Sequence, residues 1–255
     1  MINVTSSYLQ GNRHESVTKA FKPIQAAYIG DAMAEKGLVL QSLQSGRALH
    51  PDKADFQRTL ARYRGPEIGD GLFLDVIYES KHMGRGADRL MLGIYRLICQ
   101  NGLFVGKSFF AQSINHKGDA YGRLEDSLTA ALSQKDALAR QIERLQQVRM
   151  GSSEVASFVR QAVGLVVPNS APLHNSALTV IRREEDRELT AWNTFNVIQE
   201  NMMRGGSVSW IVPVTDKRTG IVSTRVMTNR AIRPNTGKDA SINQALFDIA
   251  LSFAA

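Results

Sequence analysis

Cysteine is nearly absent from this chain of 255 residues, which contains only Cys99. A single cysteine cannot form an internal disulfide or a cysteine-rich zinc site, and such scarcity is typical of a reducing compartment. The chain also lacks an apolar run of the ~20 residues that a membrane-spanning helix needs. Residues 1–10 lack the charged and apolar segments of a signal peptide. We therefore expect a cytoplasmic protein without a membrane partner, a metal or a cofactor.

Catalytic signatures are also missing. The chain has no Gly-x-Ser-x-Gly, no Walker loop, no dinucleotide-binding glycine pattern and no His-Glu-x-x-His. One constellation remains, in which Cys99 would be a nucleophile and His116 its base. A cysteine at the end of an apolar strand is more often packed than reactive, because burial disfavours the thiolate. The sequence therefore favours a binding protein over an enzyme, and we assign no catalytic residue.

Basic residues outnumber acidic ones, with 31 lysines and arginines against 24 aspartates and glutamates, a net charge of +7. This excess predicts attraction to polyanions, but it does not by itself separate nucleic acid from a membrane surface or an acidic protein. Hydrophobic residues make up 43% of the chain. That share supports a large core in one large domain or two small ones.

The first half of the chain combines a helix with a series of short β-rich runs. Residues 14–36 predict a helix, with Pro23 where it could begin and Gly37 where it could end. Turn residues then separate β-rich runs, which predicts an antiparallel meander. The runs are 38–49, 56–64, 71–79, 90–98 and 104–114. Residues 119–150 carry one apolar stripe at helical spacing, so we expect one long helix that packs across a face of this sheet.

The second half predicts more helix and a second hairpin. A short helix to about residue 163 and the linker at 168–172 precede a helix that contains Trp192. Two strands at 208–214 and 221–228 follow, and a helix at 240–253 closes the chain. The predicted fold class is α+β, with segments 1–167 and 168–255 combined in one integrated structural unit.

The Trp192 helix has an unusual polar face. Asn193, Asn196, Gln199 and Glu200 fall on one side of it with Trp192. Asparagine competes for backbone hydrogen bonds and weakens a helix, so these amides need a compensating role. They are either buried amides that bind a neighbouring loop or a polar contact surface for a partner.

Two clusters of basic residues are candidates for binding nucleic acid. One is a run of arginines on a single face of the second predicted strand, where an edge strand carrying charge against aggregation is the alternative explanation. The other is the second hairpin: residues 204–239 contain seven basic and two acidic residues. Trp210 could stack on a base there or be buried between sheet and helix. The candidate residues are Arg58, Arg62, Arg64, Arg204, Lys217, Arg218, Arg225 and Arg230.

Three sequence blocks occur in a fixed order: YRLICQNGL at 95–103, HKGD at 116–119 and WNTFNVIQEN at 192–201. In order and spacing they resemble the successive blocks of the prophage- and plasmid-encoded family of unknown function that includes YafZ, YfjQ and YubP, domain-of-unknown-function family 932. The resemblance extends from about residue 25 to the end of the chain, and the hairpin that contains Trp210 departs from it. It implies a mobile-element protein of a bacterial host cell, without an assigned activity.

The polar residues of these blocks form an expected locus. They are Asn101, His116, Asp119, Trp192, Asn193, Asn196, Gln199 and Glu200. We expect Glu200 to hold Asn101 or His116, which would bring the three blocks to one place. Asp119 is also suited to cap the helix that follows it, because its carboxylate can accept from free amides.

These observations lead to one expected function and two alternatives. We expect a non-enzymatic DNA-binding protein of a phage or plasmid that prefers single-stranded DNA and serves recombination or annealing, replication or DNA entry. The order of helix, meander and long helix resembles the outline of single-strand annealing proteins of the Rad52 type. A homo-oligomer is expected because a single subunit of 255 residues offers only a short track for a nucleic-acid strand. The alternatives are a counter-defence protein that binds a host or phage protein, and a hydrolase or transferase that uses Cys99 and His116.

Overall fold

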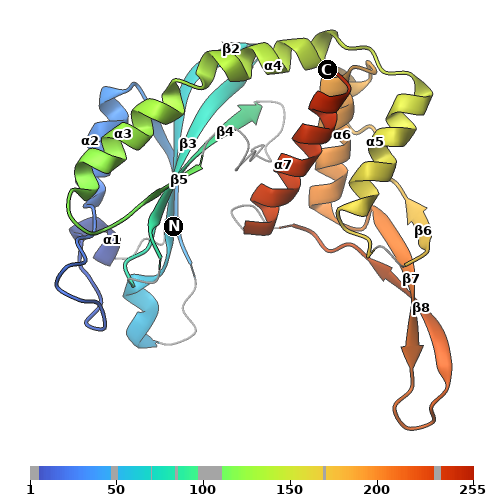
Figure 1. Ribbon diagram of the computed structural model, residues 1–255, viewed down its shortest axis with the longest axis horizontal. Helices are drawn as coiled ribbons and strands as arrows, with labels where there is room; N and C mark the ends of the chain where they lie inside the picture. The colour runs from blue at the N-terminus through green and yellow to red at the C-terminus, as the bar shows by residue number, and fades with distance from the viewer. Residues whose placement is uncertain are drawn as a thin grey trace. The chain divides into compact units, whose positions relative to one another are not determined.

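A computed structural model describes residues 6–46, 51–69, 71–83, 86–96, 111–168, 171–232 and 237–255 (Figure 1). The chain forms two compact units, Met1–Ala139 (unit 1) and Arg140–Ala255 (unit 2). Helices and antiparallel sheets are both present, so the α+β prediction is confirmed. The division between the units lies inside the helix α4 (Lys135–Gln147), and the boundary near residue 168 stays a prediction.

Unit 1 contains the predicted meander. Its five strands pair antiparallel in the order β1-β2-β3-β4-β5, so strands that follow one another in the chain are neighbours in the sheet. The strands are β1 (Val39–Ser45), β2 (Thr59–Gly69), β3 (Leu72–Ser80), β4 (Asp88–Arg96) and β5 (Ala111–Ile114). The short helix α1 (Ser6–Gln10) and the 3-10 helix η1 (Pro51–Phe56) lie outside this sheet.

One face of the sheet carries the core of unit 1. Leu74, Val76 and Tyr78 of β3 alternate onto this face and are fully buried, as their period of two predicts. The register aligns Tyr78 with Leu90 of β4, which is also fully buried. Helix α3 (Ala120–Leu132) contacts β4 and β5 and buries its own apolar stripe. The expected packing of a helix on the meander is therefore confirmed.

Two expected helices are shorter than the sequence suggested. The predicted helix at 14–36 begins only at Ala26, as α2 (Ala26–Glu35), because Pro23 lacks an N–H and restricts the residue before it. The predicted long helix at 119–150 is two helices, α3 and α4. They separate at Ser133, whose hydroxyl donates to the Ala130 carbonyl (2.8 Å) and so competes with the helical hydrogen-bond pattern.

Within the described residues, unit 2 contains the end of α4, three further α-helices and a three-stranded antiparallel sheet in the order β6-β7-β8. Phe195 on the second of these three helices and Phe247 on the third pack edge to face, with ring centroids 5.6 Å apart, and both are fully buried. The hairpin of β7 and β8 extends away from the helices of this unit (Figure 1). The elements are α5 (Ser152–Gly164), β6 (Leu173–Ser176), η2 (Glu184–Asp186), α6 (Ala191–Arg204), β7 (Val208–Thr215), β8 (Val222–Thr228) and α7 (Gly237–Ser252).

The helices are short or polar by the standard of membrane-spanning segments. Within the described ranges, none of them combines the length and the apolar composition that crossing a membrane requires.

Candidate functional site

The arginines of β2 bind carboxylates on the neighbouring strand. Arg62 pairs with Asp75 of β3, and Arg64 Nε lies 3.4 Å from Asp75 Oδ1. Arg58, the residue before β2, has its Nη1 3.0 Å from Glu79 Oε1, also on β3. Because β2 is flanked by β1 and β3, the explanation of these arginines as edge-strand charges is wrong.

Asp75 is the centre of this ion-pair group. Its side chain is only 3% exposed, and those of Arg62 and Arg64 are 23% and 19% exposed. Burial raises the pKa of Asp75, and the two guanidinium groups oppose that shift. The positive charge of β2 is therefore largely matched inside the sheet, which reduces what it can offer to an external polyanion.

The basic residues of the second hairpin differ from those of β2. Lys217, Arg218, Arg225 and Arg230 are all exposed, and within the described part of the chain none of them has an acidic partner. Arg204, by contrast, pairs with Glu200 at 3.1 Å. The hairpin therefore presents its charge to solvent, where it is available to a ligand.

Asp216 shapes the tip of this hairpin. Its Oδ1 accepts from the backbone N–H groups of Arg218 (2.7 Å) and Thr219 (3.1 Å), and these bonds lower the pKa of its carboxyl. The N–H of Gly220 donates to the Asp216 carbonyl, and Gly220 adopts a positive φ of 71° that favours glycine. The single acidic residue of the tip is thus engaged in the turn that positions Lys217 and Arg218.

The stem of the hairpin is exposed on both faces. Every residue of β8 is exposed, and β8 is the edge strand of its sheet. Exposed apolar side chains lie beside the basic ones. They are Val214, Ile221, Val222, Val226 and Met227. Trp210 is half-buried and is paired across the sheet with Leu173 and Met227.

The amides of α6 bind elements of unit 2. Asn193 Nδ2 donates to the carbonyls of Glu185 in η2 (3.2 Å) and of Glu188 in the segment that leads into α6 (3.1 Å). Gln199 Nε2 donates to Asn243 Oδ1 on α7 at 3.0 Å. All residues from Ala191 to Met202 are buried. Asn193 is therefore a buried amide that binds the chain segment before the helix. The polar face of α6 lies inside unit 2.

Three further residues of α6 show that the helix is part of the core of unit 2. Trp192 is 3% exposed and stacks on Phe195 with ring centroids 5.6 Å apart, so it belongs to the core. Asn196 is 4% exposed, and its Nδ2 has no hydrogen-bond partner within the described residues. Glu200 accepts from Arg183 Nε and Nη2, both at 3.1 Å, and from Arg204. Glu200 therefore joins the helix to the preceding loop by a largely buried ion pair.

Asn201 was missed by the sequence analysis and has the densest set of hydrogen bonds on α6. Its Nδ2 lies within 3.1 Å of the carbonyls of Leu178, Val180 and Val197. Its Oδ1 accepts from Arg182 Nε at 2.9 Å. A third asparagine in one helix could have drawn attention to Asn201. The segment that it binds, around Leu178 and Val180, could not be predicted from residue spacing.

His116 lies in unit 1 and belongs to a buried polar network. Its Nε2 lies 2.9 Å from Asp88 Oδ1, and its Nδ1 lies 3.3 Å from the Lys22 carbonyl. Asp88 also accepts from the Tyr78 hydroxyl and from the backbone N–H of Lys81 (2.7 Å). Asp88 and His116 thus join β3, β4 and the segment around Lys22 in one buried network.

His82 occupies the other side of this network. Its Nε2 lies 2.9 Å from Ser80 Oγ, and its Nδ1 lies 3.2 Å from the Asn12 carbonyl. Burial lowers the pKa of His82 from its ordinary value of 6.5. Burial also raises the pKa of Tyr78. Asp88 and its partners on β3 were not identified by the sequence analysis, which singled out only His116.

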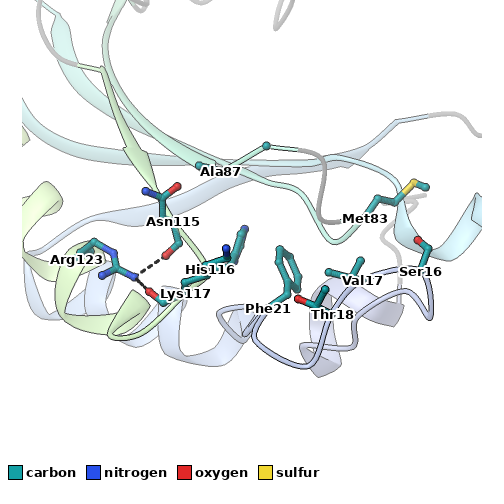
Figure 2. A pocket seen from close by; sticks show the side chains of 11 residues that line it. Ser16, Val17, Thr18, Phe21, Met83, Ala87, Asn115, His116, Lys117 and Arg123 are labelled. Carbon is teal, nitrogen blue, oxygen red and sulfur yellow. Dashed lines mark hydrogen bonds between the residues drawn. The ribbon is translucent and has the colours of Figure 1, made fainter.

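A cavity of about 790 Å³ opens beside His116. Figure 2 shows Asn115, Lys117 and Arg123 at one end of it and the rings of His116 and Phe21 at its centre. The lining residues are Ser16, Val17, Thr18, Phe21, Met83, Gly86, Ala87, Asn115, His116, Lys117 and Arg123. Next to it, Asp119 Oδ1 accepts from the Gly122 N–H (2.8 Å) as the N-cap of α3, so its capping role is confirmed.

Part of the expected common locus falls within the described residues. Asn101 and Cys99 lie outside the described residues. His116 belongs to unit 1 and Glu200 to unit 2, and each has partners in its own unit. A contact of Glu200 with Asn101 or His116 therefore stays a prediction. Among the residues that the structure describes, no three histidine, cysteine, aspartate or glutamate side chains are arranged to hold a metal ion.

Comparison with known proteins gives the family of this chain. Residues 13–247 match the model of a domain of unknown function, DUF932. The chain belongs to this family. It is similar to the UPF0380 proteins YafZ and YfjQ of Escherichia coli (strain K12). Each is 23% identical over 208 residues, which cover 81% of this chain and 76% of the relative. No solved structure matched the chain.

Proposed function

We propose that this protein binds nucleic acid, preferably single-stranded DNA, through the β7–β8 hairpin and the arginine that follows it. The observation that carries the proposal is the set of exposed cations without acidic partners in the described chain: Lys217, Arg218, Arg225 and Arg230. Phosphate contacts of lysine and arginine supply most of the sequence-independent affinity for DNA. A two-stranded β-ribbon that is exposed on both faces can lie along a strand.

The preference for a single strand rests on the apolar side chains of the same hairpin. Ile221, Val222 and Val226 are 65%, 65% and 50% exposed. A duplex stacks its bases inward, whereas an unpaired strand exposes base faces that apolar side chains can cover. We propose that this activity serves a phage or plasmid in the cytoplasm of its bacterial host, during recombination or annealing, replication or DNA entry, and that no enzymatic step is involved.

The experiment compares two double variants with equal loss of charge. Lys217→Gln with Arg218→Gln removes two cations from the hairpin tip, and Arg144→Gln with Arg160→Gln removes two exposed cations from helices of unit 2. Fluorescence anisotropy with a labelled oligonucleotide should show roughly tenfold weaker binding for the hairpin variant. The helix variant should bind nearly as the unchanged protein does. Equal affinities in both variants would reject the hairpin as the site.

A protein partner is the second candidate, because β8 is an exposed edge strand with free backbone groups. A host or phage protein could add a strand there, as expected of a counter-defence protein. The two candidates differ in salt dependence: strand addition through backbone hydrogen bonds survives salt that weakens phosphate binding. A homo-oligomer is also part of the proposal, and light scattering with oligonucleotides of increasing length should show more copies on longer strands.

A further inference from the structure

We propose that the cavity beside His116 binds a phosphate ester with a flat apolar body, such as a nucleoside monophosphate. Its volume of about 790 Å³ falls in the range of roughly 300–1,000 Å³ that is usual for small-molecule sites. The cavity belongs to unit 1, whereas the hairpin belongs to unit 2. The inference is therefore independent of the proposed hairpin function.

Arg123 provides the first part of the argument. Its Nη2 donates to the carbonyls of Asn115 (2.8 Å) and Lys117, which fixes the guanidinium at one end of the cavity (Figure 2). Its Nε is buried and has no hydrogen-bond partner in the described part of the chain. Because Nε is closed off from the cavity, a ligand would meet the guanidinium through Nη1, which is not buried and has no hydrogen-bond partner among the described residues. A guanidinium held in this way is a typical ligand of phosphate.

The charge around the cavity points to an anion. Lys117 is exposed beside Arg123, and none of the described lining residues is acidic. The nearby carboxylates already have partners: Asp88 accepts from the Lys81 N–H and pairs with His116, and Asp119 accepts from the Gly122 N–H. The positive charge of Lys117 and Arg123 is therefore not neutralised within the described walls of the site.

The opposite end of the cavity suits a flat apolar group. Val17 and Met83 line it, and the Phe21 ring continues the apolar wall toward the centre, 4.1 Å from the His116 ring, centroid to centroid. The hydroxyl-bearing residues Ser16 and Thr18 lie at the same end (Figure 2). A base could pack on the apolar side chains while a sugar bonds to the hydroxyls and a phosphate reaches Arg123. Inorganic phosphate alone would leave the apolar end unused.

Isothermal titration calorimetry on the full chain with adenosine 5′-monophosphate, adenosine and inorganic phosphate tests this assignment. The monophosphate should bind roughly tenfold or more tightly than either fragment, because charge-assisted hydrogen bonds and apolar contact both contribute. Lys117→Gln and Arg123→Lys should each weaken monophosphate binding, while adenosine binding stays unchanged. Lys36→Gln removes the same charge outside this cavity and should have no effect.

The source of the phosphate is distinguished by two oligonucleotides that differ only in a 5′-phosphate. Competition by the phosphorylated form alone identifies a strand end as the ligand, whereas binding of the monophosphate alone identifies a free nucleotide, and either supports the site. The hairpin variant Lys217→Gln with Arg218→Gln should bind the monophosphate normally, so failure of one proposal does not hide the other. A monophosphate that binds no better than adenosine, or that ignores both Lys117→Gln and Arg123→Lys, overturns the assignment.

Discussion

Asn196 and Asn201 of α6 are both buried, but their hydrogen bonds differ. Asn201 is fully buried, its amide group faces three carbonyls and its oxygen accepts from Arg182. Asn196 is 4% exposed, but its Nδ2 has no partner among the described residues. The same residue type at nearly the same depth therefore contributes differently to stability.

Replacement of each asparagine by alanine should reveal this difference. Asn201→Ala leaves buried carbonyls without a donor and should lower the free energy of unfolding by about 3 kcal/mol. Asn196→Ala removes a donor that lacks a partner and should change it by less than about 1 kcal/mol. Urea denaturation followed by circular dichroism measures both values. Equal losses would show that the hydrogen bonds of Asn201 do not stabilise the helix more than the amide of Asn196 does.

His82 predicts a pH dependence of stability at the residue scale. Burial lowers its pKa in the folded chain below the ordinary 6.5, although Asp88 and the Asn12 carbonyl oppose the shift. Below pH 6.5, His82 binds a proton in the unfolded chain more readily than in the folded chain. The free energy of unfolding should therefore fall as the pH drops below 6.5. The contribution of one such group reaches at most about 1.4 kcal/mol per pH unit.

The variant His82→Gln should reduce this slope between pH 7.5 and 5.5, as measured by denaturation at several pH values. His174→Gln is the matched control, because His174 is exposed on β6 and should leave the slope unchanged. The nearby His116 also lowers the pKa of His82, and Asp55 raises it. The test is therefore the difference in the pH slope of stability between His82→Gln and His174→Gln. Identical slopes would assign the pH dependence to other groups.

At the scale of elements, β2 and the β7–β8 hairpin carry basic residues for different purposes. The arginines of β2 compensate the buried carboxylate of Asp75. Arg62→Glu with Arg64→Glu would leave Asp75 buried beside two further carboxylates, and should destabilise unit 1 by about 3–5 kcal/mol. Lys217→Glu with Arg218→Glu changes only exposed positions and should shift stability within about 1 kcal/mol.

Thermal unfolding of these two double variants provides the measurement. A large fall in Tm is expected for the β2 variant and almost none for the hairpin variant. If the β2 variant kept its Tm and lost DNA affinity instead, those arginines would be part of the nucleic-acid surface after all.

The elements themselves were largely predictable, whereas their environments were not. Alternating apolar residues such as Leu74 and Val76 predicted the meander, because period and face are local properties. The break of the long helix at Ser133 was missed, since one apolar stripe runs through both helices. The amides of α6 were visible in the sequence, but their partners lie far along the chain, and only the fold brings Asn243 to Gln199.

At the scale of the whole molecule, the net charge of +7 predicted a polyanion partner but not where it would bind. Long-range pairing decides that question. Asp75 and Glu79 on β3 engage Arg58, Arg62 and Arg64, and Glu200 engages Arg204. Of the eight candidate basic residues, those that remain exposed without an acidic partner in the described chain are therefore Lys217, Arg218, Arg225 and Arg230. The set of candidate nucleic-acid-binding residues could therefore be reduced only from the structure, which brings Asp75 and Glu79 of β3 next to Arg58, Arg62 and Arg64.

The salt dependence of binding to single-stranded DNA tests the central claim most directly. Binding through four hairpin cations should give a slope of log affinity against log salt near −2.8, at about −0.7 per phosphate contact on a single strand. Lys217→Gln with Arg218→Gln should make that slope shallower by about 1.4, because two contacts are lost. A slope near zero, or one that the hairpin variant leaves unchanged, would contradict nucleic-acid binding by this hairpin.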